Sequence, residues 1–243
     1  HGGLAKDIFG VLSRWLRKIP GSLAISTVFA CSMMAALCGS SPVTAATIGK
    51  ISIPEMVEKG YRKPFALGSS VVGGTIGILI PPSLSLIVYG IITETSIAKL
   101  FIAGIVPGVL LSLMLAAYII PAVVIRPDLT HVETAATAEK AVEKYTLKQD
   151  FLLIVPSVIL ILLVLVTMYT GLVTPTEAGG IGALGAFVIV LFMGRLTVKA
   201  FASVMRESAK TTAMLMFLMI GGMCFAYVIS ALGLPQVATE FIL

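Results

Sequence analysis

The sequence predicts an all-α polytopic membrane protein, and three observations carry this prediction. Hydrophobic residues make up 58% of the chain and charged residues only 12%, whereas soluble domains carry roughly 25% charged residues. The apolar runs are continuous, unlike the alternating pattern of an outer-membrane barrel. Several runs reach or exceed the length of about 20 residues that a spanning helix needs. The lipid bilayer is therefore the expected environment.

The charged residues and the candidate nucleophiles exclude other classes. The net charge is +5, but the cations are dispersed in short loops between apolar runs, which is typical of membrane topology signals and not of nucleic-acid binding. His1 and His131 lie outside the apolar runs, and no HExxH, G-x-S-x-G or Walker A sequence occurs. Cys31, Cys38 and Cys224 show no paired spacing. We expect no enzyme activity and no nucleic-acid partner.

The apolar runs and the loops between them divide the chain into eight expected segments. These are a cytoplasmic basic arm at 1–20, a first re-entrant hairpin at 21–49, a cytoplasmic loop at 50–64, a broken helix followed by a spanning helix at 65–125, a cytoplasmic loop at 126–150, two spanning helices at 151–194, a basic arm at 195–210, and a second, truncated hairpin at 211–243. We take the chain to be a fragment of a longer protein.

The positive charges favour a hairpin at 21–49 over a straight span. If this run turns at GSSP and leaves by the face it entered, 16 of the 17 Lys and Arg residues fall on one face and only Lys99 on the other. A straight span would divide them 12 against 5. The positive-inside rule prefers the first arrangement and makes the basic face cytoplasmic, as in a bacterial inner-membrane protein.

The first candidate site is the stretch LCGSSPVTAAT at 37–47, which interrupts this run. Irregular backbone at membrane depth occurs only where protein or a wet cavity surrounds it. The first limb of the hairpin would offer carbonyls for a cation such as Na⁺, and the second limb, starting near Val43, would offer amides and a positive dipole end for a carboxylate. The alternative is a kinked helix whose small residues permit close packing. The candidate residues are Gly39, Ser40, Ser41, Thr44 and Thr47.

The second candidate site is VVGGTIGILIPPSLSLIVYG at 71–90. Glycines lower its helix propensity, and adjacent prolines remove two backbone donors, so we expect a discontinuous helix with free carbonyls near residues 77–80. The alternative is a simple proline kink. The candidate residues are Gly73, Gly74, Thr75, Gly77, Pro81, Pro82 and Ser83.

A third candidate lies in TGLVTPTEAGGIGALGA at 170–186. Pro175, Thr176 and Glu177 are typical of a helix start with an acid near the positive dipole end. Glu177 is either an ion ligand or a capping charge, and the sequence leaves both open.

Near the C-terminus, the pattern of the first hairpin recurs weakly. A basic arm leads into an apolar run, which ALGLPQ interrupts before VATEFIL, as CGSSP interrupts the first run. Broken segments at matching places in two halves indicate the inverted repeats of secondary transporters.

At this point, the motifs resemble the large membrane subunit of TRAP transporters, the DctM-like family. The resemblance rests on GSSPVTAATIG, IPEMVEKGYRK and GGTIGILIPPSLSLIVYG, and it continues through TSIAKLFIAGIVPG and TPTEAGGIGALGA. Cys38 and Pro42 depart from the usual family pattern. Neither removes an evident oxygen ligand, although Pro42 removes one amide at the tip.

The resemblance implies an elevator-type secondary transporter with two hairpins of inverted topology. It further implies coupling to Na⁺, no other cofactor, a small membrane partner subunit and a periplasmic substrate-binding protein. Family substrates are organic acids, including C4-dicarboxylates and sialic acids. By position, the first hairpin tip falls at Gly39–Thr44, the broken helix at Gly73–Ser83, and the second tip near Gly233–Pro235.

Two other functions are also compatible with the sequence. One is a single-component Na⁺/divalent-anion symporter, which shares such hairpins but needs no binding protein. The other is a channel or scaffold subunit without coupled transport.

Overall fold

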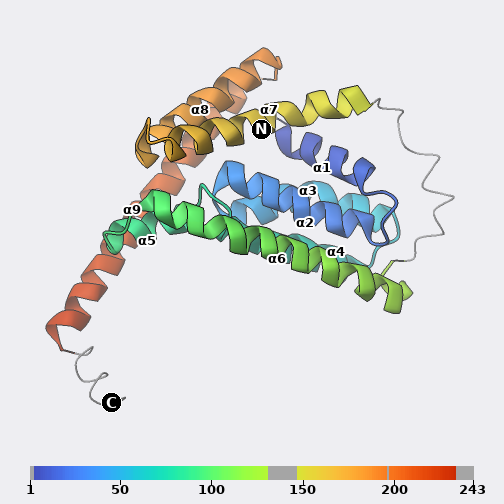
Figure 1. Ribbon diagram of the computed structural model, residues 1–243, viewed down its shortest axis with the longest axis horizontal. Helices are drawn as coiled ribbons and strands as arrows, with labels where there is room; N and C mark the ends of the chain where they lie inside the picture. The colour runs from blue at the N-terminus through green and yellow to red at the C-terminus, as the bar shows by residue number, and fades with distance from the viewer. Residues whose placement is uncertain (1–2, 131–146, 196, 234–243) are drawn as a thin grey trace. The chain divides into compact units, whose positions relative to one another are not determined.

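Apolar helices make up the protein, as the computed structural model shows for residues 3–130, 147–195 and 197–233 (Figure 1). The prediction of an all-α membrane class is confirmed: only an isolated bridge between Tyr61 and Thr130 has strand character in these ranges. The helices are α1 (Leu4–Trp15), α2 (Ser22–Cys38), α3 (Ser41–Glu58), α4 (Lys63–Thr75), η1 (Ile76–Ile78), α5 (Leu84–Ile92), α6 (Ile97–Ile125), η2 (Pro127–Leu129), α7 (Leu147–Tyr169), α8 (Pro175–Phe192) and α9 (Val198–Ala231).

The chain divides into two compact units, which are described separately. The larger unit covers residues 2–195 and contains α1 to α8, and the smaller one contains α9. Among the described residues, three helices are long and apolar enough to cross a membrane: Ile97–Ile125, Gln149–Tyr169 and Val198–Ala231. The α8 helix is apolar but shorter, in keeping with its run lying at the short limit for a span.

The α2 and α3 helices form an antiparallel pair. Only Gly39 and Ser40 separate them, and the hydroxyl of Thr27, near the start of α2, donates to the sulfur of Met56, near the end of α3 (3.6 Å). Figure 1 shows the two helices side by side in the larger unit. The α3 helix begins at Ser41, slightly before the predicted start near Val43.

The α4 helix returns antiparallel to α3 and packs on both limbs of this pair. The hydroxyl of Ser70 on α4 donates to the Ala45 carbonyl of α3 (3.1 Å), and the thiol of Cys31 on α2 faces the Ser70 carbonyl (3.9 Å). The main apolar core lies between these helices, with Ile25, Ile48 and further apolar side chains fully or almost fully buried. Apolar burial at about 25 cal/mol per Å² dominates the stability of such a core.

The connection between α3 and α4 is shorter than the loop predicted at 50–64. The α3 helix continues through Lys50 and Pro54 to Glu58, and α4 begins at Lys63. The physical reason is the pattern of burial, because Ser52 and Met56, one helical turn apart, are both fully buried against neighbouring helices. Tertiary packing therefore extends the helix past a proline.

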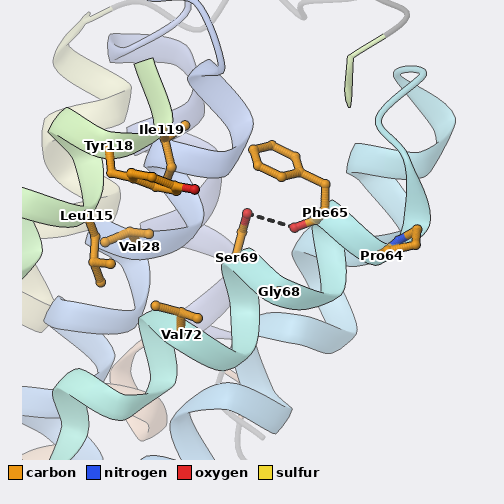
Figure 2. Close-up of a pocket in the computed structure, with 9 residues that line it drawn as sticks. All are labelled: Val28, Pro64, Phe65, Gly68, Ser69, Val72, Leu115, Tyr118 and Ile119. Carbon is orange, nitrogen blue, oxygen red and sulfur yellow. Dashed lines mark hydrogen bonds between the residues drawn. The ribbon is translucent and has the colours of Figure 1, made fainter. Parts of the chain in front are cut away.

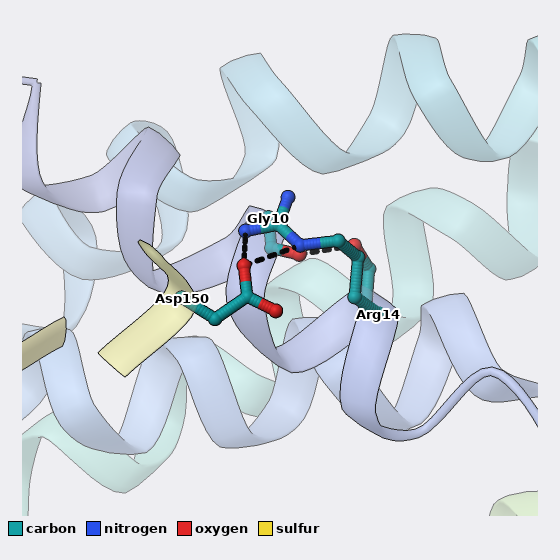
Figure 3. Close-up of polar contacts among 4 residues, drawn as sticks. Gly10, Arg14 and Asp150 are labelled. Atoms are coloured by element: carbon teal, nitrogen blue, oxygen red, sulfur yellow. Dashed lines mark hydrogen bonds and ion pairs between the residues drawn. The ribbon is translucent and has the colours of Figure 1, made fainter. Parts of the chain in front are cut away.

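The α1 helix is amphipathic and is tied to α7 and to the end of α8. Its Ile8 and Phe9 side chains are buried. The Arg14 guanidinium forms an ion pair with Asp150 at the start of α7 (Figure 3), with Nε of Arg14 donating to Oδ1 of Asp150 (2.7 Å). Arg195, which follows α8, pairs with Asp7 (2.5 Å). The predicted arm at 1–20 is thus largely a packed helix.

The α7 and α8 helices form a second antiparallel pair. A Cβ on Gly182 would lie 2.9 Å from Val164, and one on Gly185 would lie 2.9 Å from Leu160, so these two glycines let the helices approach closely. The α7 helix begins at Leu147, within the segment predicted as the loop 126–150, whose residues 131–146 lie outside the described ranges.

The α9 helix runs without interruption across the predicted boundary between a basic arm and a second hairpin. It continues from Val198 through Lys210 to Ala231, because nothing between these residues removes a backbone donor. Gly233 then takes a positive φ of 66°. The remainder of the predicted second hairpin, residues 234–243, lies outside the described part of the chain.

Candidate functional site

The first break is a two-residue interruption between α2 and α3. Gly39 has φ +61° and its N–H donates to the Ala35 carbonyl (2.7 Å), which closes α2. Ser40 is extended, with φ −137° and ψ 120°, and its carbonyl accepts from Thr44 N–H (3.0 Å). The carbonyl end of one helix and the amide end of the next therefore meet at one point, with partial charges of opposite sign.

The second break lies between η1 and α5. The N–H groups of Leu79 and Ile80 both donate to the Ile76 carbonyl (2.9 and 3.1 Å), and the helix ends there. The bond between Pro81 and Pro82 is cis, and α5 begins at Leu84. Two adjacent prolines cannot donate the hydrogen bonds that would continue the helix, so the segment 79–83 is free to take an irregular path.

The two breaks contact each other. The N–H of Leu84 donates to the Gly39 carbonyl (2.9 Å), and any Cβ on Gly39 would collide with the Pro82 carbonyl oxygen. A Cβ on Gly77 would lie 3.0 Å from both Cα and N of Ser41. The two interrupted segments, distant in sequence, thus form one irregular cluster of backbone, which we call the break cluster (residues 39–44 and 75–84).

Two buried hydroxyls in the break cluster have no hydrogen-bond partner among the described residues. They belong to Thr44 in the first turn of α3 and to Ser83 just before α5, and both side chains have 0% relative exposure. Leaving a buried polar group unsatisfied costs about 1–3 kcal/mol. Both hydroxyl oxygens are therefore suited to bind a ligand that satisfies them. Ser26, Ser52, Ser157 and Tyr169 share this property outside the cluster.

The other predicted residues of the first break are less deeply placed. The Ser41 hydroxyl donates weakly to the Thr75 carbonyl (3.5 Å), which links α3 directly to the end of α4. Ser40 and Thr47 are half-buried. The Thr75 side chain is exposed, and its own hydroxyl donates to the Val72 carbonyl (2.7 Å).

Gly73 and Gly74 serve close helix packing. A Cβ on Gly73 would lie 3.2 Å from the sulfur of Cys31 on α2, and one on Gly74 would lie 2.5 Å from the Cβ of Ala45 on α3. The backbone of α4 therefore touches both limbs of the hairpin. These glycines allow α4, which leads into the second break, to pack closely against α2 and α3, which flank the first break.

The third predicted site is separate in character. The Thr174 N–H donates to Oε2 of Glu177 (2.7 Å), and the Glu177 N–H donates to the Thr174 hydroxyl (3.4 Å), which is a reciprocal capping box at the start of α8. Glu177 is exposed. Of the two interpretations left open by the sequence, the structure displays the capping contacts. The side chain of Thr176 lies outside the described part.

The α6 helix also packs against the second break, a contact not predicted from the sequence. A Cβ on Gly104 would collide with the Leu79 carbonyl oxygen, and one on Gly108 would lie 2.8 Å from Cγ1 of Ile80. One turn further along, Ser112 shares a hydrogen bond with Ser32 of α2 (2.9 Å). The signal was present as Gly104-x-x-x-Gly108, the spacing that lets helices approach closely in membranes. These small residues of α6 allow the backbone of the second break to pack closely against that helix.

The donors available at the break cluster are hydroxyls, backbone carbonyls and helix ends. Across the described residues, no group of three or more His, Cys, Asp or Glu side chains is placed to hold a metal ion. Neutral oxygen donors suit a hard cation of low charge better than a transition metal, and the amide end of α3 suits an anionic group.

Comparison with known protein sequences identifies the family of this chain. The sequence pattern of the family described as "Tripartite ATP-independent periplasmic transporter, DctM component" matches residues 1–243. The chain therefore belongs to this family of TRAP transporter large permease subunits, a family of transporter components and not of enzymes.

Three relatives illustrate the range of the family. The C4-dicarboxylate TRAP transporter large permease protein DctM of Pseudomonas aeruginosa is 39% identical over 97% of this chain and 53% of its own length. The isethionate TRAP transporter permease protein DctMQ of Oleidesulfovibrio alaskensis is 34% identical over 100% of this chain and 37% of its own length. The sialic acid TRAP transporter large permease protein SiaM of Vibrio cholerae is 30% identical over 99% and 55%. The chain spans about half the length of most curated relatives that it matches.

Proposed function

We propose that the protein containing this chain is the large membrane subunit of a binding-protein-dependent secondary transporter that takes up an organic acid together with Na⁺. The observation that carries the proposal is the contact between two breaks that each carry an unpartnered buried hydroxyl, Thr44 in the first and Ser83 in the second. Membership of the family supports the transport class.

The break cluster supplies the groups that a coupled site needs. Hydroxyls, together with the carbonyls that would have accepted from the missing N–H groups of Pro81 and Pro82, would provide neutral oxygen ligands for Na⁺. The amide end of α3 attracts the carboxylate of the substrate. Because irregular backbone is stable at membrane depth only where it is enclosed or lines a wet cavity, occupancy by ion and substrate would also stabilise the fold.

Transport then requires the site to face each side of the membrane in turn. The segment from α2 to η1 packs closely through Gly73, Gly74 and Gly77, so it is suited to move as a unit in an elevator-type cycle. We propose the bacterial inner membrane as its location, with a small membrane subunit and a periplasmic substrate-binding protein as partners. The substrate class is a C4-dicarboxylate or a sialic-acid-like organic acid, following the names of the relatives.

Uptake into proteoliposomes tests this function. The complete permease, its small subunit and the binding protein are reconstituted, and uptake of radiolabelled succinate and sialic acid is followed with and without an inward Na⁺ gradient. We expect uptake of one substrate that requires both the gradient and the binding protein. Uptake that needs no binding protein would instead identify a single-component symporter, and flux independent of the gradient would identify an uncoupled path.

A further inference from the structure

An apolar groove lies between α4 and α6, away from the break cluster. It has a volume of about 240 Å³, and its lining residues are Val28, Pro64, Phe65, Gly68, Ser69, Val72, Leu115, Tyr118 and Ile119 (Figure 2). The one hydroxyl of α4 in the wall, that of Ser69, already donates to the Phe65 carbonyl (2.9 Å). The groove therefore offers an almost wholly hydrocarbon surface to an occupant.

The mouth of the groove lies at the surface of the helices. Tyr118 is 69% exposed and Val72 is 42% exposed, and α6 is one of the helices long and apolar enough to cross a membrane. Because the outer face of such a helix lies in lipid, the mouth of the groove faces the hydrocarbon of the bilayer and not water.

The depth of the groove matches one leaflet. Its α6 wall runs from Ile119, seven residues before Arg126, to Leu115, eleven residues before it, and its α4 wall ends at Val72, nine residues after Lys63. At 1.5 Å per residue, the far ends of the two walls lie about 14–16 Å from the helix ends. Half of a hydrocarbon core about 30 Å thick is about 15 Å, so the groove has the extent of an acyl chain in one leaflet.

A basic junction closes the polar end of the groove. The Arg62 N–H donates to the Leu129 carbonyl (3.0 Å), so the start of α4 and the segment after α6 lie together. The Arg62 guanidinium pairs with Asp128 (3.0 Å). Lys63 and Arg126 at the same junction are exposed and have no acidic partner among the described residues. Within the described part of the chain, the junction therefore presents two positive charges at headgroup level in addition to the Arg62–Asp128 pair.

We infer that this groove is a binding site for an anionic membrane phospholipid, with an acyl chain between α4 and α6 and the phosphate headgroup at Lys63 and Arg126. The apolar wall, the depth of one leaflet and the two cations select this occupant together. The inference rests on the membrane location of the chain and not on the proposed Na⁺ coupling.

Native mass spectrometry of the complete delipidated permease tests the site. Phosphatidylglycerol and phosphatidylcholine with identical acyl chains are titrated separately, and the dissociation constant of the first bound lipid is measured. We expect phosphatidylglycerol to bind more tightly. Each basic residue near a membrane surface strengthens the attraction about fivefold, so the double variant Lys63→Gln/Arg126→Gln should weaken phosphatidylglycerol binding about 25-fold. The variant Lys99→Gln, at the opposite end of α6, is its control.

A second variant tests the groove itself. A side chain at Gly68 points into open space, so Gly68→Leu fills the groove without displacing its neighbours, and we expect at least tenfold weaker binding of both lipids. Gly179→Leu on α8, where the added Cβ also meets nothing, is the matched control. Equal affinity in Gly68→Leu and Gly179→Leu would overturn the site, as would equal binding of the two lipids by the unmodified protein. Displacement of the lipid when the small membrane subunit binds would instead assign the groove to a protein partner.

Discussion

The stretches 71–90 and 170–186 both combine several glycines with proline, yet they have different structures. In the first, the glycine at position 77 approaches the backbone of Ser41, and the helix breaks. In the second, an unbroken helix begins at Pro175 after a short turn, and Cβ atoms on Gly179 and Gly180 would meet nothing within 4 Å. Composition alone therefore does not distinguish a discontinuous helix from a capped one.

The position of proline accounts for the difference. Pro175 is the first residue of α8, where the missing N–H would have had no partner in any case. Pro81 and Pro82 lie inside an apolar segment, where two donors are lost in succession. The stretch 71–90 is then stabilised by contact with the first break at Gly39, whereas the stretch 170–186 needs only the reciprocal bonds of Thr174 and Glu177.

The largest expected effect is at the contact between the two breaks. Gly39→Val places a β-branched residue at φ +61° and against the Pro82 carbonyl, so we expect a loss of about 2–5 kcal/mol in the free energy of unfolding. Thermal unfolding of the complete protein in detergent measures it. Gly179→Val, in open space on α8, should leave the melting temperature nearly unchanged. Equal losses in the two variants would show that the breaks are not mutually supported.

The next effect concerns the connection of α1 to the α7–α8 pair. Asp150 is 3% exposed, so Asp150→Asn removes the carboxylate charge from a largely buried ion pair with Arg14 and should cost about 3 kcal/mol. Asp128→Asn removes a partner from the exposed pair with Arg62 and should cost less than about 1 kcal/mol. Unfolding of both variants is compared in the same detergent. Similar costs for the two would contradict the role assigned to the buried pair.

A smaller effect on the free energy of unfolding, opposite in sign to those above, tests whether Thr44 in the break cluster binds an ion or only packs. Thr44→Val removes an unpartnered buried hydroxyl, so in choline chloride it should raise stability by about 1 kcal/mol. In NaCl it should lose the stabilisation that Na⁺ gives to the unmodified protein.

Ser157→Ala is the matched control for Thr44→Val, because its hydroxyl on α7 is equally buried and unpartnered. It should change stability similarly in both salts and retain the Na⁺ effect. A full Na⁺ response in Thr44→Val would remove this hydroxyl from the ion site.

The smallest effect belongs to the capped segment. Thr174→Ala removes the cap of α8 and should cost about 1 kcal/mol, with the same Na⁺ response as the unmodified protein. Melting curves in NaCl and choline chloride check both statements. Loss of the Na⁺ response would indicate that the segment around Glu177 contributes to the ion site.

The sequence was sufficient for the helical class and for the location of unusual backbone, because continuous apolar runs and adjacent prolines act locally. It was insufficient for the contact between Gly39 and Pro82, because that contact depends on how α3, α4 and α6 pack. The close packing of Gly104 and Gly108 against the second break was not predicted either, although their spacing is visible in the sequence. The loop expected at 50–64 became largely helical because burial of Met56 favours helix across Pro54.

The most direct test of the ion site is the melting temperature of the complete purified protein in NaCl and in choline chloride at equal ionic strength. A ligand that binds only the folded state stabilises it by about 2.7 kcal/mol at 100 times its dissociation constant. We predict a saturable rise in melting temperature that is specific to Na⁺. Identical melting temperatures in the two salts at all concentrations would contradict a Na⁺ site at the break cluster.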